Sequence, residues 1–488
     1  MNDLRPSHVD LQATAKQIMM EYGFEPEFPP GVPRQLADLR THPPQIVPGP
    51  AVRDLRNLLW SSIDNDTSLD LDQIEVAERL PNGDVKVLIG ISDVDAFVPK
   101  NSPIDQYAAK ETTSVYTGVR IFPMLPEELS TGATSLLENG DKLSVVTEFV
   151  VSSDGTLRSE DVYRAILHNK AQLAYNAVGG WLENTGAAPP KVAASTDLQA
   201  QLKLQDQVAQ VLRKQRYQQG ALNLATVEVT PILLHQEVVD VVNLEKNRAT
   251  ELIEDFMIAA NGVVARMLEK VSSLRRIVKT PERWDRIVQL AASHNEKLPA
   301  DPDSKALNDF LVKRQAADPD HFADLSLAVI KLIGPGEYVL ERPGDPAQGH
   351  FGLAVLDYTH STAPNRRFPD IVTQRLIKAV LSGKPAPYSD NELTAIAGNC
   401  TQKGDAARKV ERAMSKRLAA IAMSRRIGET FDAIVTGASE KGTFVRVLQP
   451  RAEGMLVQGQ QGADVGDKLR VKLTRTDVQR GYIDFVRA

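Results

Sequence analysis

The most constraining feature of this 488-residue sequence is a hairpin signal at residues 73–98, QIEVAERLPNGDVKVLIGISDVDAFV. Apolar and polar residues alternate on both sides of Asn82 and Gly83, a dipeptide that favours a tight hairpin turn. Similar strand-like runs return at residues 142–167. Because a single two-stranded hairpin is barely stable in water, the pattern predicts that these strands belong to one larger sheet.

Much of the remaining chain has a helical pattern. Residues 194–300 are expected to be helical, and ATELIEDFMIAANGVVARMLEKV is the clearest amphipathic helix among them. Another helix is expected from near Pro364 towards Leu381. A basic helix is expected to follow, with Asp405 at its head and Gly428 at its tail.

The two ends of the chain differ from its centre. Residues 1–50 predict two short helices, the first with Asp10 as N-cap, and a Pro-rich linker after them. Both a miniature helix-turn-helix and a small docking arm fit this pattern. The last sixty residues alternate short apolar strands with Gly-containing turns, which is typical of a small barrel.

A chain of this length is expected to contain several domains. The changes in pattern predict a small helical unit at residues 1–50, a central domain at 51–428 and a barrel at 429–488. The fold class that we expect is therefore α+β multidomain, with a mixed α/β central domain.

Composition narrows the classes of protein to be considered. Cys400 is the only cysteine, which excludes an internal disulfide and fits a reducing compartment. No run approaches the roughly 20 apolar residues of a membrane span, so we expect a cytoplasmic protein without a membrane partner, and a monomer. The net charge is −6, but residues 360–428 carry +8 and residues 429–488 carry +1, which leaves −15 for the rest. A polyanion responds to such local charge, although a solvated basic helix explains it equally well.

Three aspartates precede the predicted hairpin in the stretch SIDNDTSLDLDQIEV, where Asp66 adds a fourth acidic side chain. Asp64, Asp70 and Asp72 lie within nine residues of one another. A solvated acidic loop is the simplest explanation, but crowded carboxylates also suit a divalent cation. Mg²⁺ prefers hard oxygen ligands and binds through a few carboxylates together with a substrate phosphate. Asp70 and Asp72 are two residues apart, so they share a face if the backbone is extended.

A second candidate segment, YTHSTAPNRRFPD, lies far downstream at residues 358–370. Its adjacent Arg366 and Arg367 are the residue type that binds phosphate in a bidentate manner and spreads transition-state charge. An arginine pair is weak evidence alone. Together with an acidic metal cluster, it is the arrangement expected for phosphoryl transfer.

Several sequence blocks follow one another in a characteristic order. The blocks are SIDNDTSLDLDQIEV, SDV at 92–94, TSVY at 113–116, FPMLPEELS at 122–130, LIEDFMIAANGVVA at 252–265 and STAPNRRFPD at 361–370. With these blocks, the central domain resembles the catalytic domain of the ribonuclease II / ribonuclease R family, and together with the C-terminal barrel the resemblance covers about residues 55 to 488. The resemblance implies a processive, Mg²⁺-dependent 3′→5′ hydrolytic exoribonuclease that releases nucleoside 5′-monophosphates, with Mn²⁺ as an alternative ion.

The resemblance also implies roles for individual residues. Asp64, Asp70 and Asp72 take the places of the first three catalytic and metal-binding aspartates, and Arg366 that of the arginine at the scissile phosphate. Tyr116 matches the tyrosine against which the 3′-terminal base packs, which sets the length of the final oligonucleotide. Glu254 lies in the helix motif that supplies a base-clamping carboxylate, and Asp255 is an equally near candidate.

The C-terminal barrel provides a second set of RNA-binding candidates. The string VTGASEKGTFVRV closely resembles the first strands of the RNA-binding OB fold that is repeated in a large ribosomal protein. Such barrels bind single strands through a basic groove and stacked aromatics. Lys441 and Phe444 are the first candidates, and Arg446, Lys472 and Arg475 extend the groove. The aromatic ring could instead be part of the barrel core.

Three departures from the family pattern bear on function. Gln73 stands where the family has a fourth aspartate, so the predicted metal site loses one charge. Ala407 stands where many members carry a glutamate near the active site. Only about 50 residues precede the catalytic block, too few for the paired cold-shock barrels common in the family, so we expect a more open entrance that admits structured RNA.

Two other functions remain open from the sequence alone. One is an RNA-binding relative that has lost catalysis through the change at Gln73. The other is a DNA-binding regulator that uses residues 1–45, where basic residues are too few to favour it.

Overall fold

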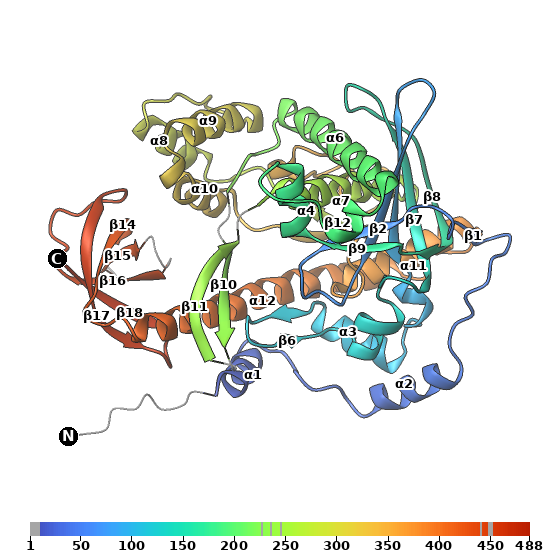
Figure 1. Cartoon of the computed structure of the whole chain (residues 1–488), viewed down its shortest axis with the longest axis horizontal. Coiled ribbons are helices and arrows are strands. Elements are labelled where there is room, and N and C mark those ends of the chain that lie inside the picture. Colours follow the sequence, from blue (N-terminus) through green and yellow to red (C-terminus); the bar gives the residue numbers. More distant parts are fainter. Residues whose placement is uncertain (1–9, 226–227, 235–236, 245, 440–441, 448–451) are drawn as a thin grey trace.

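The computed structural model describes residues 10–488, apart from 226–227, 235–236, 245, 440–441 and 448–451. A large α/β body occupies one side of the molecule, and a small barrel lies at the other end (Figure 1). One long helix, α12, joins the two parts (Figure 1). The α+β multidomain fold class expected from the sequence is thus confirmed, with its helical N-terminal residues and its C-terminal barrel.

The predicted hairpin is the centre of the main sheet. Strands β3 (Gln73–Arg79) and β4 (Val85–Ser92) pair antiparallel with Arg79 opposite Val85. Gly83 in the turn has φ +90°, a conformation that favours glycine. The sheet has seven strands in the order β1-β8-β7-β4-β3-β2-β9. The other five are β1 (Arg53–Asp54), β2 (Ser61–Asp64), β7 (Asp141–Val151), β8 (Leu157–His168) and β9 (Ala171–Ala174).

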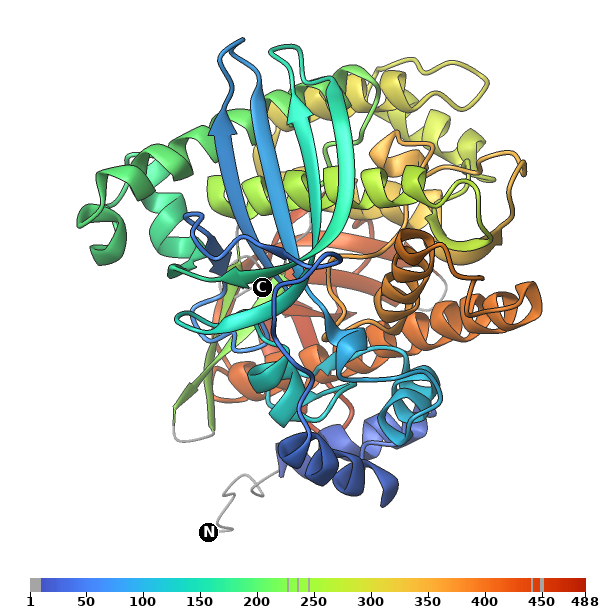
Figure 2. The ribbon, with the colours of Figure 1, turned by 90° about the vertical axis from the view of Figure 1, so that its right-hand side faces the viewer.

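Helices cover one face of this sheet and form the main hydrophobic core with it. Helices α4 (Tyr175–Leu182), α6 (Thr196–Gln218) and α7 (Arg248–Met267) pack on this side, and Figure 2 shows helices crossing behind the strands. Phe149 from the sheet and Phe256 from α7 are fully buried in the core. The predicted amphipathic helix is therefore confirmed as α7, whose buried face anchors it against the sheet.

The expectation that residues 194–300 are helical throughout is wrong. A hairpin of β10 (Glu228–Leu234) and β11 (Glu237–Leu244) separates α6 from α7, and β12 (Ser273–Ile277) follows α7. The segment PILLHQEVVDVV is rich in branched apolar residues, which favour a strand over a helix.

Two helices of the C-terminal half begin at positions other than those predicted. Helix α11 (Phe368–Ser382) starts four residues after Pro364, because the preceding segment forms a loop. Helix α12 (Asp390–Ser424) starts fifteen residues before Asp405. Its N-terminus is fixed by a capping box, in which Ser389 accepts from the Glu392 N–H and Glu392 accepts from the Ser389 N–H. Asp405 is therefore a residue within α12 and not its N-cap.

The N-terminal residues form two helices that are anchored separately. Asp10 caps α1 (Leu11–Glu21) as predicted, accepting a 2.9 Å hydrogen bond from the Ala13 N–H. Helix α1 packs against α12, whereas α2 (Gly31–Thr41) packs against α3 (Pro103–Glu111). The helix-turn-helix arrangement is not formed in these residues, because the two helices pack separately, α1 on α12 and α2 on α3.

The C-terminal strands close into a barrel in the order β14-β15-β16-β18-β17. Its core includes Ala420 and Met423 of α12, so the long helix forms part of the barrel's packing. The strands are β14 (Thr430–Ser439), β15 (Gly442–Val447), β16 (Ala452–Gln458), β17 (Lys468–Asp477) and β18 (Tyr482–Arg487).

The remaining elements complete the body around the sheet. Helices α8 (Trp284–Ser293), α9 (Ser304–Ala317) and α10 (Pro319–Ile333) pack together around a small core of their own. Across the described ranges, no helix is long and apolar enough to span a bilayer. The remaining helices and strands are β5 (Val115–Tyr116), β6 (Ile121–Phe122), α5 (Pro190–Ala193) and β13 (Glu337–Glu341).

Candidate active site

A cavity of about 960 Å³ lies where the end of β2, the loop before β3, the β5–β6 hairpin, α7 and α12 meet. Eight of the residues singled out from the sequence line it. They are Asp64, Asp70, Asp72, Gln73, Tyr116, Glu254, Arg366 and Arg367. The structure thus brings together segments that are separated by up to about 300 residues in the chain.

Asp72 is the most deeply placed carboxylate of the cavity. Its side chain is buried, and the Asn365 N–H donates a 2.8 Å hydrogen bond to Oδ1. The guanidinium Nε of Arg366 lies 3.4 Å from Oδ2. Burial raises the pKa of Asp72 to about 7, and the charge of Arg366 only partly offsets that rise. A second positive charge near Asp72 would therefore be strongly favoured.

The other two aspartates are half-buried and less constrained. Asp64 accepts a 2.8 Å hydrogen bond from the Asn65 N–H, and burial raises the pKa of its carboxyl. Asp70 accepts a 3.1 Å hydrogen bond from the hydroxyl of Tyr116. Their remaining oxygen lone pairs are available for a ligand in the cavity.

The arginine loop is fixed to two neighbouring elements by hydrogen bonds. The Ser114 N–H donates to the carbonyl of Arg366 at 3.0 Å, so the strand that carries Tyr116 is attached to the arginine segment. Asn261 of α7 accepts hydrogen bonds from both the N–H (2.8 Å) and the hydroxyl (2.9 Å) of Ser361. Because these contacts are buried, the Arg366 head group is presented to the cavity from a rigid base.

The donor set of the cavity fits a hard divalent cation. Three carboxylates and the amide of Gln73 line one wall, and Asp72 has a raised pKa that a cation would lower. In the part of the chain that the structure describes, no three His, Cys, Asp or Glu side chains form a preassembled metal cage. Mg²⁺ rarely needs such a cage, since it binds through one or two carboxylates with waters and substrate phosphate.

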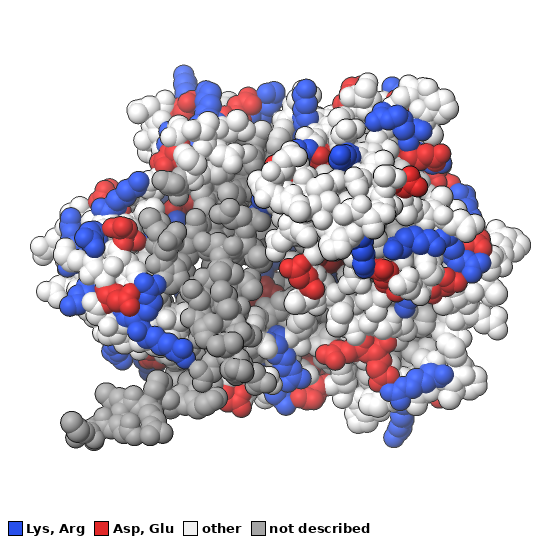
Figure 3. Space-filling model, viewed as in Figure 1, with Lys and Arg blue, Asp and Glu red and all other residues white. Residues whose placement is uncertain are grey.

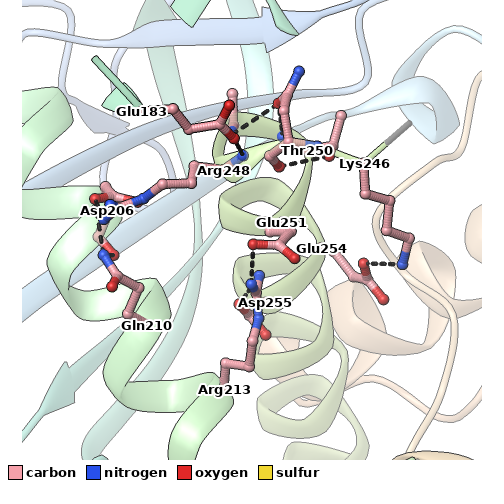
Figure 4. A network of polar contacts seen from close by, with 12 residues as sticks. Glu183, Asp206, Gln210, Arg213, Lys246, Arg248, Thr250, Glu251, Glu254 and Asp255 are labelled. Atoms are coloured by element: carbon pink, nitrogen blue, oxygen red, sulfur yellow. Dashed lines mark hydrogen bonds and ion pairs between the residues drawn. The ribbon is translucent and has the colours of Figure 1, made fainter. Parts of the chain in front are cut away.

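The two acidic candidates on α7 have different surroundings (Figure 4). Asp255 is buried and accepts hydrogen bonds from Arg213 and Arg216 of α6, so it joins the two helices. Glu254 is exposed, lines the cavity and forms a 2.6 Å ion pair with Lys246. Of the two, Glu254 is therefore the residue placed to meet a ligand.

Sequence reasoning missed an acidic residue on α12. Ala407 of α12 is buried against α1, where its small side chain fits. Glu411 lies one helical turn further along α12 and lines the cavity. The Glu411 carboxylate accepts a 3.3 Å hydrogen bond from the Tyr116 N–H. The sequence signal for Glu411 is a glutamate four residues after the expected position, on the same face of the helix. Arg412 beside it and Tyr175 at the start of α4 also line the cavity.

The barrel candidates do not line this cavity. Phe444 is half-buried on β15, and Lys472 and Arg475 are exposed on β17. Arg446 forms an ion pair with Asp324 of α10, which ties the barrel to the catalytic body. Lys441 lies outside the described residues. On the face shown in Figure 3, acidic and basic side chains are interspersed among the residues that the structure describes.

Comparison with known proteins places this geometry in a family. The model of the RNB domain matches residues 52–383, well over half of the chain. The chain belongs to the RNB family of exoribonucleases. The resemblance inferred from the sequence blocks is thus confirmed. A second family model, the RNase II-type exonuclease C-terminal S1 domain, matches residues 429–488 of this RNB protein.

Individual relatives agree with the family assignment. Ribonuclease R of Thermotoga maritima is 31% identical to the RNB protein over an alignment of 523 residues. The alignment covers 100% of this chain and 71% of that protein. The chain spans between 52% and 71% of the length of the Ribonuclease R relatives compared. The apo form of Mycoplasma genitalium RNase R superposes with a TM-score of 0.86 at 22% identity, covering 98% of this chain and 78% of that one.

Fold alone does not separate active from inactive members. The structure of yeast Ssd1, described as a pseudonuclease, matches with a TM-score of 0.69 at 16% identity, covering 95% of this chain and 57% of that one. Activity must therefore be argued from the cavity side chains.

Proposed function

We propose that this RNB protein is a Mg²⁺-dependent, processive 3′→5′ exoribonuclease that hydrolyses single-stranded RNA to nucleoside 5′-monophosphates, and that it acts in the cytoplasm as a monomer. The contact between Arg366 and Asp72, in one cavity with Asp64 and Asp70, is the observation that carries the proposal. It places the group that would bind a phosphate beside the groups that would bind a metal.

Each residue has a distinct part in this proposal. Asp64, Asp70 and Asp72, with the amide oxygen of Gln73, would hold Mg²⁺. The bound ion would activate a water and stabilise the leaving oxygen. Arg366 binds the scissile phosphate, because its exposed guanidinium has further N–H groups beyond the one that faces Asp72.

The tyrosine and glutamate of the cavity would position the RNA end. The Tyr116 side chain is 37% exposed, and it offers an aromatic face on which any base can stack. Glu254 lines the same cavity from α7 and would contact the base from there. Stacking on an aromatic face does not depend on base identity, so we expect little sequence preference.

A non-catalytic RNA-binding relative is the second candidate. Gln73 is buried at the cavity wall and brings no charge, which weakens metal binding relative to four carboxylates. The fold is also similar to that of yeast Ssd1, described as a pseudonuclease, and is thus compatible with this second candidate. Against it, the three aspartates and Arg366 remain together in the cavity.

The test is the identity of the products. RNA labelled at its 5′ end should be shortened from the 3′ end with Mg²⁺ and should release 5′-monophosphates, whereas chelation should stop the reaction. RNA that is bound but stays intact at any Mg²⁺ concentration would support the non-catalytic relative. A stem-loop with a 3′ tail tests the expectation that an open entrance admits structured RNA. Digestion past the base of the stem supports an open entrance, and arrest several nucleotides before the stem contradicts it.

A further inference from the structure

Helix α1 lies behind the wall of the cavity that carries Tyr116. Its buried residues recur on one face, at Leu11, Ala15, Ile18 and Met19. This spacing lets the helix pack along its whole length against a single surface. That surface is formed by α12 together with the β5–β6 hairpin.

Two hydrophobic clusters make the contact. Leu11 packs with Leu418, a residue of α12 that itself lines the cavity. The larger cluster joins α1 to both strands of the β5–β6 hairpin and to residues 407–414 of α12. Its members are Ala15, Ile18, Met19, Phe24, Val115, Phe122, Ala407, Val410 and Met414.

The β5–β6 hairpin has two sides with different roles. Val115 is fully buried towards α1, whereas its neighbour Tyr116 is exposed to the cavity. Successive residues of a strand point to opposite faces, so the surface that supports Val115 also sets where Tyr116 stands. Each strand is only two residues long, and so short a hairpin has little stability of its own.

Polar contacts lock the end of α1 in place. The Nζ of Lys403 donates a 2.7 Å hydrogen bond to the Gly23 carbonyl and lies 4.5 Å from the centre of the Phe24 ring. The Glu25 N–H donates to Glu111 at 3.1 Å, and the hydroxyl of Tyr107 donates to the Glu25 carbonyl at 2.8 Å. The helix is thus held as a fixed part of the catalytic body.

The three aspartates belong to a different part of the structure. Asp64 ends β2 of the main sheet, and Asp70 and Asp72 precede β3, whereas the α1 clusters contain no residue of either strand. A disturbance of α1 should therefore reach the tyrosine before it reaches the carboxylates.

We propose that α1 is a positioning element for the RNA end: it holds the β5–β6 hairpin so that Tyr116 stands at a fixed distance from the carboxylates, and it thereby sets the length of the oligonucleotide that escapes digestion. The inference rests on the proposed function, in which Tyr116 receives the 3′-terminal base. It gives the N-terminal helix a part in product length and not only in stability.

The experiment compares Ile18→Ala on α1 with Leu36→Ala on α2 in the full-length chain. Both substitutions remove a buried aliphatic side chain of the same size, but Leu36 packs in the main core away from the hairpin. End products of 5′-labelled RNA are resolved at single-nucleotide resolution, and KM and kcat are measured on short and long RNA.

We expect Ile18→Ala to lengthen or broaden the final product by at least about one nucleotide. Its KM for short oligonucleotides should rise about fivefold or more, the effect of weakened stacking, with kcat on long RNA near that of the parent. Leu36→Ala should leave product length unchanged. If Ile18→Ala does not fold, product length and KM are measured instead on the milder variant Ile18→Val.

Tyr116→Ala separates failure of this inference from failure of the proposed function. A change in product length with Tyr116→Ala, but none in the folded Ile18 variant, would overturn the role of α1 alone. An unchanged product in Tyr116→Ala would overturn the stacking role of Tyr116 and the inference with it. Equal changes in the Ile18 and Leu36 variants would reduce α1 to a general structural role and also overturn the inference.

Discussion

The candidate active-site cavity and the C-terminal barrel hold their candidate functional residues in different ways. In the cavity, Asp72 is buried, and backbone and side-chain groups of the arginine loop contact its two oxygens. On the barrel, Phe444 is half-buried on β15, and Arg446 is paired with Asp324 of the neighbouring helix α10. Buried hydrogen bonds fix the geometry of the cavity, whereas the barrel residues lie outside the cavity. We therefore expect substitutions in the cavity to change turnover and those on the barrel to change affinity.

The largest expected effect is that of Asp72→Asn. The substitution keeps the side-chain size and removes the charge that Arg366 and a metal ion share, so kcat should fall about a thousandfold or more with RNA affinity nearly unchanged. Asp66→Asn is the matched control, because Asp66 lies exposed in the same acidic stretch and does not line the cavity. Single-turnover rates and filter binding measure the two properties. Equal turnover in both variants would show that the cavity is not the site of chemistry.

Gln73→Asp tests whether the side chain at position 73 contributes to metal binding in the cavity. A fourth carboxylate at this wall should bind the metal more tightly, so the Mg²⁺ concentration at half-maximal rate should fall about tenfold. The measurement is a Mg²⁺ titration of the initial rate at saturating RNA. No change in the midpoint would mean that residue 73 does not face the ion.

Phe444→Ala tests the barrel. Loss of one stacking surface should raise the Kd for single-stranded RNA about tenfold and leave kcat unchanged. Arg446→Ala and Asp324→Ala, measured together, decide what the ion pair does. If Arg446 only ties the barrel to α10, both variants change affinity alike, whereas a loss confined to Arg446→Ala shows direct RNA contact.

The last expected effect is on stability and not on RNA binding or turnover, and it involves Glu75. This carboxyl is fully buried on β3, and neither of its oxygens has a hydrogen-bond partner in the described structure. Burial raises its pKa well above the usual value, so the folded protein keeps a proton there that the unfolded chain loses above about pH 4.5. The free energy of unfolding therefore falls as pH rises through that range, by about 1.4 kcal/mol per pH unit from this group.

Glu75→Gln should remove this pH-dependent cost. In metal-free buffer, we expect the Tm of the variant to exceed that of the parent by more at pH 7.5 than at pH 4.5. Differential scanning fluorimetry at the two pH values measures the difference. A Tm difference that does not depend on pH would contradict the buried, unpaired state of this side chain.

Local sequence patterns predicted those parts of the structure that depend on local contacts. The β3–β4 hairpin followed from alternation around Asn82 and Gly83, and the cap of α1 followed from Asp10. The start of α12 was missed, although Ser389 and Glu392 carry a capping-box signal, because Asp405 was interpreted as the start of the basic helix. Capping depends on four residues and is easily outweighed by composition.

The candidate site was predictable where the family pattern is strict, and less so where helix register matters. The aspartates and Arg366 could be named from their blocks, and the structure brings them into one cavity. Glu411 was missed because the expected position, Ala407, lies one helical turn earlier on the same face, and sequence alone did not show which of the two turns borders the cavity. The ion pair of Arg446 with Asp324 joins residues 122 positions apart, and no local pattern encodes such a contact.

Direct detection of a divalent cation tests the central claim, that the clustered carboxylates of the cavity hold a metal ion against an RNA phosphate. Mn²⁺ binding can be followed by electron paramagnetic resonance on the parent, Asp66→Asn and Asp72→Asn proteins, each loaded with RNA whose last linkages resist hydrolysis. The account predicts tightly bound Mn²⁺ in the parent and in Asp66→Asn, and its loss in Asp72→Asn. Equal Mn²⁺ binding in all three proteins would contradict it.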